Sequence, residues 1–256
     1  MNLVRLRVFI RSLFLQSAWN FERMQNVGFT FALAPFIRQL YKGDRRRIGQ
    51  RLKDHFGFFN THPYLANLLL GIVMGLEERH ARGEIGSEEI LRTRAMLAGP
   101  VAAIGDRLIW STWRVFCSAL GIAVFMAGGR EGFWFSPGVT AVCATFLLVY
   151  NAGNLPLRYA ALRWGYDHSG GVIQQLSTFG LQRWVLRIRT AGRFVLLMAA
   201  AVYSVTFESV ILTVVFWLFV VGAFTLKRRF RAMQVFYLLY AAIMLAAYGF
   251  TLGKTG

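Results

Sequence analysis

The sequence predicts an all-α fold: a polytopic helical membrane protein with re-entrant or broken helices and an N-terminal amphipathic helix. Hydrophobic residues make up 56% of the 256 residues and aromatic residues 15%, more than a soluble domain usually carries. Long apolar runs fill the second half, whereas short runs interrupted by glycine and proline fill the first. We expect one membrane domain over residues 1–256, with an amphipathic, cytoplasmic and re-entrant half at 1–112 and transmembrane spans at 113–256.

Residues 2–18 predict the amphipathic helix, lying on the cytoplasmic surface of the membrane. Arg7 and Arg11 stand four residues apart among leucine, valine, phenylalanine and isoleucine, so they share one helical face. A secretory signal peptide is a poor interpretation, because Arg11 interrupts its hydrophobic core and no small-x-small cleavage site precedes Trp19. We therefore expect a cytoplasmic N-terminus.

Two short apolar segments in the first half predict re-entrant or broken helices. Residues 27–37 and 64–76 are too short to cross a bilayer core that needs roughly 20 helical residues. Transporters use such segments near their binding sites. We expect the first segment to end at Pro35. The strongly basic segment 42–53 between them predicts a cytoplasmic helix near anionic headgroups.

The next segment begins with a helix start and continues with two glycine-containing pairs. Glu88 and Glu89 directly after Ser87 are typical of a helix N-terminus. Gly99-Pro100 and Gly105-Asp106 indicate either a hinge with a buried aspartate or a loop with an ordinary turn residue. Both interpretations stay open at this point.

Long apolar runs from residue 113 onward predict the transmembrane spans. The second span is expected to end at Tyr150, with an interfacial aromatic stretch at 159–166 and a polar loop at 167–182. Basic flanks at 183–193 and 227–231 place those segments in the cytoplasm, and the turn around Glu208 outside, by the positive-inside rule. The expected spans are, in order, 113–127, 133–150, two short spans within 194–226, and 232–252.

The polar motif at residues 19–25 has the composition of a sugar site. Trp19-Asn20-Phe21-Glu22-Arg23-Met24-Gln25 holds an acid, a base and two amides beside aromatic rings, directly before an apolar run. Amides and carboxylates bind hydroxyl groups, and a ring covers the apolar face of a sugar. The alternative is a helix start with one surface ion pair.

The sequence does not support nucleic-acid binding, a metal site or a phosphocarrier histidine. The net charge of +17 could indicate nucleic acid, but the basic residues beyond residue 114 cluster between apolar runs, so we expect no nucleic-acid partner. Cys117 and Cys143 lack metal-ligand spacing and lie in apolar runs, so they are interpreted as packing residues. We expect no metal, no cofactor and no phosphocarrier histidine, since the setting of His55, His62, His80 and His168 singles out none of them; His62 is interpreted as a polar neighbour of the site.

A set of motifs over roughly residues 12–121 carries a specific resemblance to a known family. The first covers residues 17–41 and includes the motif at 19–25. The others, further along the chain, are Phe58-Phe59-Asn60-Thr61-His62-Pro63, Gly71, Leu76-Glu77-Glu78, Gly83, Gly99-Pro100, Gly105-Asp106, Trp110, Thr112, Arg114 and Phe116. With these motifs the sequence resembles the IID membrane component of mannose/fructose/sorbose-family phosphoenolpyruvate-dependent sugar phosphotransferase systems.

This resemblance implies a function and a set of partners. A IID subunit in the bacterial inner membrane, paired with a IIC subunit in trimers of IIC–IID pairs, would bind a hexose or amino sugar and move it inward. IIA and IIB phosphocarrier proteins would supply the phosphoryl group on entry, and membrane lipids would surround the pair. The alternative is a IID-like receptor or regulatory subunit that does not transport.

The resemblance also implies substrate-binding residues. They are first Trp19, Asn20, Glu22, Arg23 and Gln25, then Asn60 and Thr61, and last Asp106 and Glu77. Taken singly, each is more often a structural ion pair or cap than a ligand. Arg107 stands where the family pattern has proline after Gly-Asp, which leaves the hinge geometry and the transport activity open.

Overall fold

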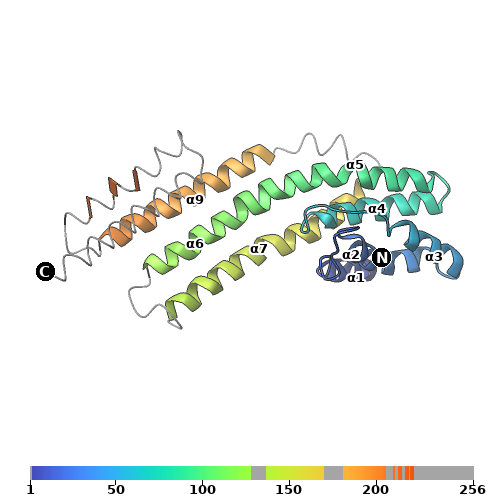
Figure 1. Cartoon of the computed structure of the whole chain (residues 1–256), viewed down its shortest axis with the longest axis horizontal. Coiled ribbons are helices and arrows are strands. Elements are labelled where there is room, and N and C mark those ends of the chain that lie inside the picture. Colours follow the sequence, from blue (N-terminus) through green and yellow to red (C-terminus); the bar gives the residue numbers. More distant parts are fainter. Residues whose placement is uncertain are drawn as a thin grey trace. The chain divides into compact units, whose positions relative to one another are not determined.

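The regular structure in the part of the chain that the computed structural model describes is helical, and loops connect the helices. That part covers residues 2–127, 137–169 and 181–205, with the separate positions 210, 213, 214, 217, 218, 220 and 221. The chain divides into two compact units, Met1–Leu196 and Leu197–Gly256, and the first holds the elements discussed below up to residue 196. In chain order (Figure 1) the helices are α1 (Asn2–Ser12), α2 (Asn26–Leu40), α3 (Arg45–Asp54), α4 (Ala66–Ala81), α5 (Ser87–Gly105), the π-helix η1 (Asp106–Trp113), α6 (Arg114–Ala127), α7 (Pro137–Asp167) and α9 (Leu181–Ser204).

Helix α2 continues past Pro35, so the expectation that this proline ends the first short segment is wrong. Proline has no N–H to donate to the carbonyl four residues earlier, which belongs to Phe31. Arg11 of α1 replaces that donor, with its Nη1 3.3 Å from the Phe31 oxygen. The contact between α1 and α2 therefore allows the helix to run on to Leu40.

Helix α4 forms the centre of the core. Each residue from Ala66 to Glu77 is buried. It packs closely on α7, because glycines let the two backbones approach: a Cβ atom at Gly71 would lie 2.1 Å from the Leu162 carbonyl oxygen. Close approach through small residues is a common way for helices to pack in membranes.

Helix α7 is one helix of 31 residues, which corrects the expectation of a span that ends at Tyr150. Asn151 does not interrupt it, since its Nδ2 donates to the Leu147 carbonyl one turn earlier at 2.7 Å. Arg158 anchors the helix to the end of α1 through a 2.7 Å hydrogen bond to the Ser12 carbonyl. Within the described ranges, its segment Val139–Asp167 is the one helix long and apolar enough to cross a membrane.

The predicted helix start at Ser87 is confirmed, because α5 begins there. The glycine pairs form neither a loop nor a chain break: α5 runs through Gly99-Pro100 and passes directly into η1 at Asp106. A π-helix is wider than an α-helix and often marks a functional site. Arg107, in place of the expected proline, reaches α9 through Nη2 and Gln182 Oε1 at 3.0 Å.

The basic segment 42–53 forms a helix as predicted, and its start is capped. Asp44 Oδ1 accepts a 2.8 Å hydrogen bond from the Arg47 backbone N–H at the first turn of α3. The expected turns at 128–132 and 204–209, most of the loop at 167–182, and the segments 227–231 and 232–252 lie largely or wholly outside the described residues.

Candidate functional site

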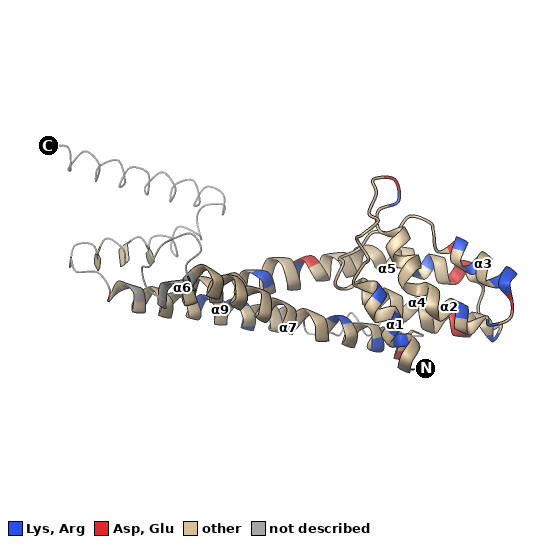
Figure 2. Ribbon diagram, turned by 90° about the horizontal axis from the view of Figure 1, so that it is seen from below, with Lys and Arg blue, Asp and Glu red and all other residues tan. Residues whose placement is uncertain are grey.

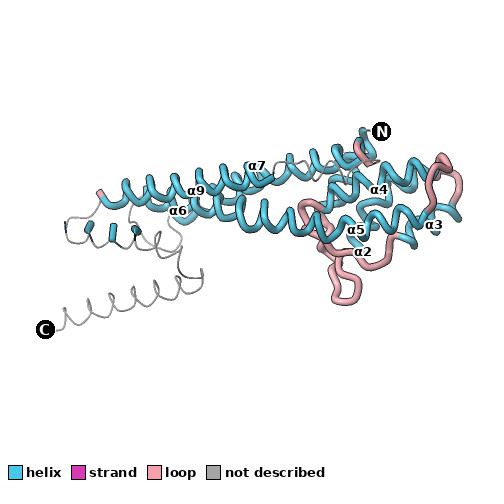
Figure 3. Tube along the Cα trace, turned by 90° about the horizontal axis from the view of Figure 1, so that it is seen from above, coloured by secondary structure: helices cyan, strands magenta, loops and turns pink. Residues whose placement is uncertain are grey.

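The loop between α1 and α2 closes on itself and projects from the helices. Backbone hydrogen bonds join Asn20 and Met24 in both directions, at 2.9 and 3.2 Å. Asn20 Oδ1 also accepts from the Arg23 backbone N–H at 2.8 Å. Met24 has a φ of 57°, the left-handed conformation that lets so short a turn close. Figure 2 shows one acidic and one basic position at the tip of the projecting loop, and Figure 3 shows the same loop in pink.

A reciprocal pair of hydrogen bonds fixes this loop to the loop before α4. Gln25 Nε2 donates to the Thr61 carbonyl at 2.8 Å, and the Thr61 N–H donates to Gln25 Oε1 at 3.2 Å. The Gln25 N–H adds a 2.8 Å bond to the Phe59 carbonyl. Both loops therefore form one unit, although 36 residues separate Gln25 from Thr61.

The tip of this unit exposes side chains that soluble surfaces usually cover. Phe21 is 86% exposed and Phe58 62%, and Trp19 packs edge-on against Phe21 with ring centroids 4.8 Å apart. Glu22 and Arg23 form a 3.3 Å ion pair with side chains 80% and 53% exposed. An ion pair that is so exposed to solvent contributes little to stability. These groups are available to a ligand or to another protein.

His62 lies directly behind the second loop, against the start of η1. Its ring occupies the space that a side chain at Gly105 would need, and it packs edge-on against Trp110 with centroids 4.7 Å apart. Burial lowers the pKa of His62 to about 4, although the nearby Asp106 carboxylate opposes this shift. The ring is therefore neutral at pH 7.

Both ring nitrogens of His62 lack a hydrogen-bond partner within the described part of the chain. A buried polar group without a partner is costly and calls for an explanation. Sequence reasoning gave His62 only a neighbouring role. The signal that could have marked it is its place in Asn60-Thr61-His62-Pro63, a polar break between two apolar helices.

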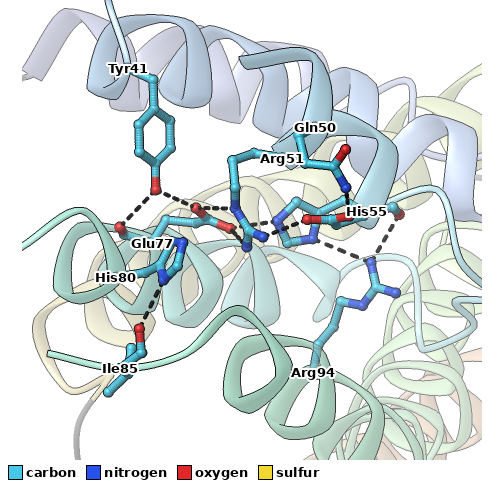
Figure 4. A network of polar contacts seen from close by, with 9 residues as sticks. Tyr41, Gln50, Arg51, His55, Glu77, His80, Ile85 and Arg94 are labelled. Atoms are coloured by element: carbon cyan, nitrogen blue, oxygen red, sulfur yellow. Dashed lines mark hydrogen bonds and ion pairs between the residues drawn. The ribbon is translucent and has the colours of Figure 1, made fainter. Parts of the chain in front are cut away.

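Glu77 lies in a separate buried network between α3 and α4 (Figure 4). Arg51 binds its carboxylate in a bidentate manner, with Nε 3.1 Å from Oε2 and Nη2 2.5 Å from Oε1. Tyr41 donates to Oε2 at 3.0 Å, and the His55 Nε2 lies 2.8 Å from Oε1. Burial alone would raise the pKa of Glu77, but the hydrogen bonds from His55 and Arg51 lower it to about 2. Glu77 is thus an anion whose oxygens are engaged by protein donors.

The network extends from Glu77 toward the loops through His55. Burial lowers the pKa of His55 although its bond to Glu77 opposes this, so the neutral ring donates from Nε2 and leaves Nδ1 as an acceptor. Arg94 Nη1 lies 3.5 Å from that Nδ1 and 2.9 Å from the His55 carbonyl. Burial lowers the pKa of Arg94 to about 10, which still leaves it charged at pH 7. Its guanidinium is 5.6 Å from the ring of Phe59, next to the clamped loop.

The structure brings together most of the residues that the sequence predicts. Trp19, Asn20, Glu22 and Arg23 share the projecting loop, and Gln25 joins it to Thr61 and the exposed Asn60. Asp106 is exposed on η1 and lies near this group through His62. Glu77 belongs to the separate ion network instead. The described residues contain no cluster of acids, histidines or cysteines suited to a metal ion.

Comparison with known proteins relates the chain to one protein family. The family model for the PTS system mannose/fructose/sorbose family IID component matches residues 3–228. The mannose-specific EIID component of Escherichia coli (strain K12) is 34% identical over 190 residues, which cover 74% of this chain and 64% of that protein. The fructose permease IID component of Bacillus subtilis (strain 168) is 31% identical, over 74% of this chain and 65% of that protein. This chain thus spans slightly less than two thirds of the length of these relatives.

Solved structures agree with this relationship. A cryo-EM structure of the mannose transporter ManYZ in complex with microcin E492 contains a chain with 26% identity and a TM-score of 0.59, covering 99% of this chain and 97% of that one. A second structure, described as a membrane protein, has 25% identity and a TM-score of 0.67, with 97% of each chain covered. The fold is therefore that of a helical membrane protein, and the chain belongs to the IID component family of mannose/fructose/sorbose phosphotransferase systems.

Proposed function

We propose that this chain is the IID membrane subunit of a bacterial sugar phosphotransferase transporter. Together with a IIC subunit it binds a hexose or amino sugar and moves it inward, and phosphorylated IIB then phosphorylates the sugar. IIA supplies the phosphoryl group to IIB, and we expect no phosphocarrier residue in this chain. Family membership supports the proposal, as does the kinship to a mannose-specific component.

The observation that carries the proposal is the clamped pair of loops. Gln25 and Thr61 use their hydrogen-bonding groups on each other, so their role is to position the loops. The tip then presents Trp19, Asn20 and Glu22, the kinds of side chain that bind sugar hydroxyls and ring faces. Arg23, Asn60 and Asp106 are also exposed, and we assign them to the proposed site.

The same surface supports a IIC partner. The exposed rings of Trp19 and Phe21 pack against each other, and Phe58 is exposed on the loop before α4; aromatic side chains are enriched at protein interfaces. His62 is buried behind that loop, and within the described part of the chain neither of its ring nitrogens has a hydrogen-bond partner. We propose that the sugar lies between this surface and the IIC subunit, within a trimer of IIC–IID pairs.

The membrane placement follows from the helices. We propose a multi-pass protein of the bacterial inner membrane with a cytoplasmic N-terminus, because α1 carries Arg7 and Arg11 beside an exposed apolar face. The basic segment 183–193 at the start of α9 is cytoplasmic for the same reason.

Sugar uptake tests the proposal directly. Cells that carry the gene with its neighbours, and cells from which it alone is deleted, are compared for uptake and phosphorylation of labelled mannose, glucosamine and fructose. We expect the deletion to abolish uptake of at least one sugar and the intact gene on a plasmid to restore it. Unchanged uptake of all sugars, with the protein present in the membrane of the parent, would instead identify a IID-like receptor or regulatory subunit.

A further inference from the structure

A groove between α1 and the end of α2 is lined by four cations. Arg7 and Arg11 of α1 face Arg38 of α2 and Lys42, which follows α2, across a cavity of about 540 Å³. None of the residues that line the groove is acidic. Figure 2 shows basic residues on both helices. The groove lies apart from the clamped loops and has no part in the proposed sugar site.

The four cations of the groove repel one another unless an anion lies between them. Arg7 and Arg11 are four residues apart, and so are Arg38 and Lys42, so each helix end places like charges on neighbouring turns. Arg11 is held by the Phe31 carbonyl and lies over the Phe31 ring. The other three cations have no ion-pair partner among the described residues, which leaves their charge available.

The groove opens onto an apolar surface. Ile10 lines the groove and is also 47% exposed on the outer face of α1. That face continues along the helix, since Leu3 is 67% exposed, Leu6 47% and Leu13 43%, while Val4 and Val8 on the opposite side are buried in the core. A helical wheel places Arg7 and Arg11 at the border between the exposed and the buried apolar faces. Helices of this kind lie in the membrane interface with their cations at headgroup level.

These observations together identify the occupant by its chemistry. We propose that the groove binds an anionic phospholipid, with its phosphodiester among the four cations and an acyl chain along the outer face of α1. Charge alone would also suit free phosphate, but the continuous apolar face beside the cations fits a ligand with a hydrocarbon tail. The lipid would fix α1 against α2 and so support the part of the fold from which the clamped loop emerges.

Lipid titration of the full-length protein in detergent tests this proposal. Native mass spectrometry measures the Kd of the first bound lipid for palmitoyl-oleoyl phosphatidylglycerol and for phosphatidylcholine with the same chains. We expect the anionic lipid to bind more tightly. The double variant Arg7→Gln/Arg38→Gln should weaken its binding about 30-fold, which corresponds to about 1 kcal/mol for each cation. Lys42→Gln alone should weaken it about fivefold.

The controls separate this site from general attraction and from a phosphate site. Arg45→Gln/Arg46→Gln removes two exposed cations of α3 outside the groove and should leave the Kd unchanged. Equal losses in both double variants would overturn the specific site. Full displacement of the lipid by 10-fold excess glycerol phosphate would show a phosphate site without a lipid tail. Equal affinity for both lipids would also overturn the proposal.

Discussion

Gln25 and Thr61 hold each other through two hydrogen bonds, one from the Gln25 amide to the Thr61 carbonyl and one from the Thr61 N–H back to Gln25. Both bonds are buried, and they join two loops that are separated in the sequence by the whole of α2 and the whole of α3. The exposed tip that we assign to the sugar is therefore positioned by residues that do not face it.

Removing the clamp should destabilise the loops. Gln25→Ala leaves the N–H and the carbonyl of Thr61 without partners, and each unpaired buried group costs about 1–3 kcal/mol. We expect a lower thermal unfolding midpoint and faster proteolysis within residues 13–25. Gln39→Ala is the matched control, since Gln39 is exposed on α2. Equal midpoints for both variants would show that the clamp contributes nothing.

Breaking the Glu77 network should cost more than breaking a surface pair. Glu77→Gln leaves Arg51 buried without its main anion, and loss of one partner of a buried pair costs about 3–5 kcal/mol. Glu84→Gln removes an exposed partner of Arg79 and Arg82, and exposed ion pairs contribute little, so this variant should lose much less stability. Denaturant unfolding of the two purified variants measures the difference, and similar losses would contradict a structural role for Glu77.

Stability should fall as the pH drops below about 6.5. The pKa values of His55 and His62 are lowered in the fold from an ordinary value of 6.5, so the unfolded chain binds more protons in this range. For His62, with a pKa of about 4, the loss between pH 6.5 and 4 is of order 3 kcal/mol. Glu77 adds a further loss only as the pH falls from about 4.5 toward 2. His62→Asn should flatten the stability curve between pH 6.5 and 4, whereas an unchanged slope would contradict the low pKa.

The packing of α4 on α7 should fail when the glycine contact is filled. Gly71→Ala places a methyl group 2.1 Å from the Leu162 carbonyl oxygen, so the helices must move apart, at a cost of about 1–3 kcal/mol. Gly49→Ala on α3 meets nothing within 4 Å and should stabilise by up to about 1 kcal/mol. Opposite shifts of the unfolding midpoint are expected, and shifts of the same sign would refute the close approach.

The sequence predicts local features here better than it predicts their connections. The start of α5 at Ser87 follows from residue types within one turn, and so does the basic helix α3. The continuation of α2 through Pro35 could not be predicted, because it depends on Arg11 from another helix. The full length of α7 was missed for a related reason: Arg158 holds its second half against Ser12, 146 residues away.

The candidate site shows the same limit. The motif at 19–25 indicates sugar chemistry by composition, yet composition does not separate exposed Glu22 from buried Gln25. Glu77 and Asp106 look alike as acids beside turns, but only the fold surrounds Glu77 with Arg51 and His55. Within the described residues the ring nitrogens of His62 have no hydrogen-bond partner because the ring packs against Gly105 and Trp110. These contacts cannot be read from the residues next to His62 in the sequence.

The projecting loop offers the most direct test of the proposed sugar site. Glu22→Gln keeps the shape of the side chain and removes its charge, and the open pair with Arg23 makes the effect on stability less than about 1 kcal/mol. Loss of a hydrogen bond to a charged group costs about 1.5–3 kcal/mol, or roughly 10- to 150-fold in affinity. Uptake should therefore fall by that factor while the protein still reaches the membrane with its partner.

Asn20→Ala complements this test from the same turn. Its Oδ1 caps the Arg23 N–H, so the variant combines the loss of a ligand with a looser loop, and uptake should fall at least as far as in Glu22→Gln. Glu84→Gln serves again as the control, because it changes an exposed, paired glutamate far along the chain. Membrane levels and copurification with the IIC subunit are measured for all three variants. Normal uptake by Glu22→Gln would remove Glu22 from the site, whereas reduced protein with normal uptake per complex would make the loop a structural element.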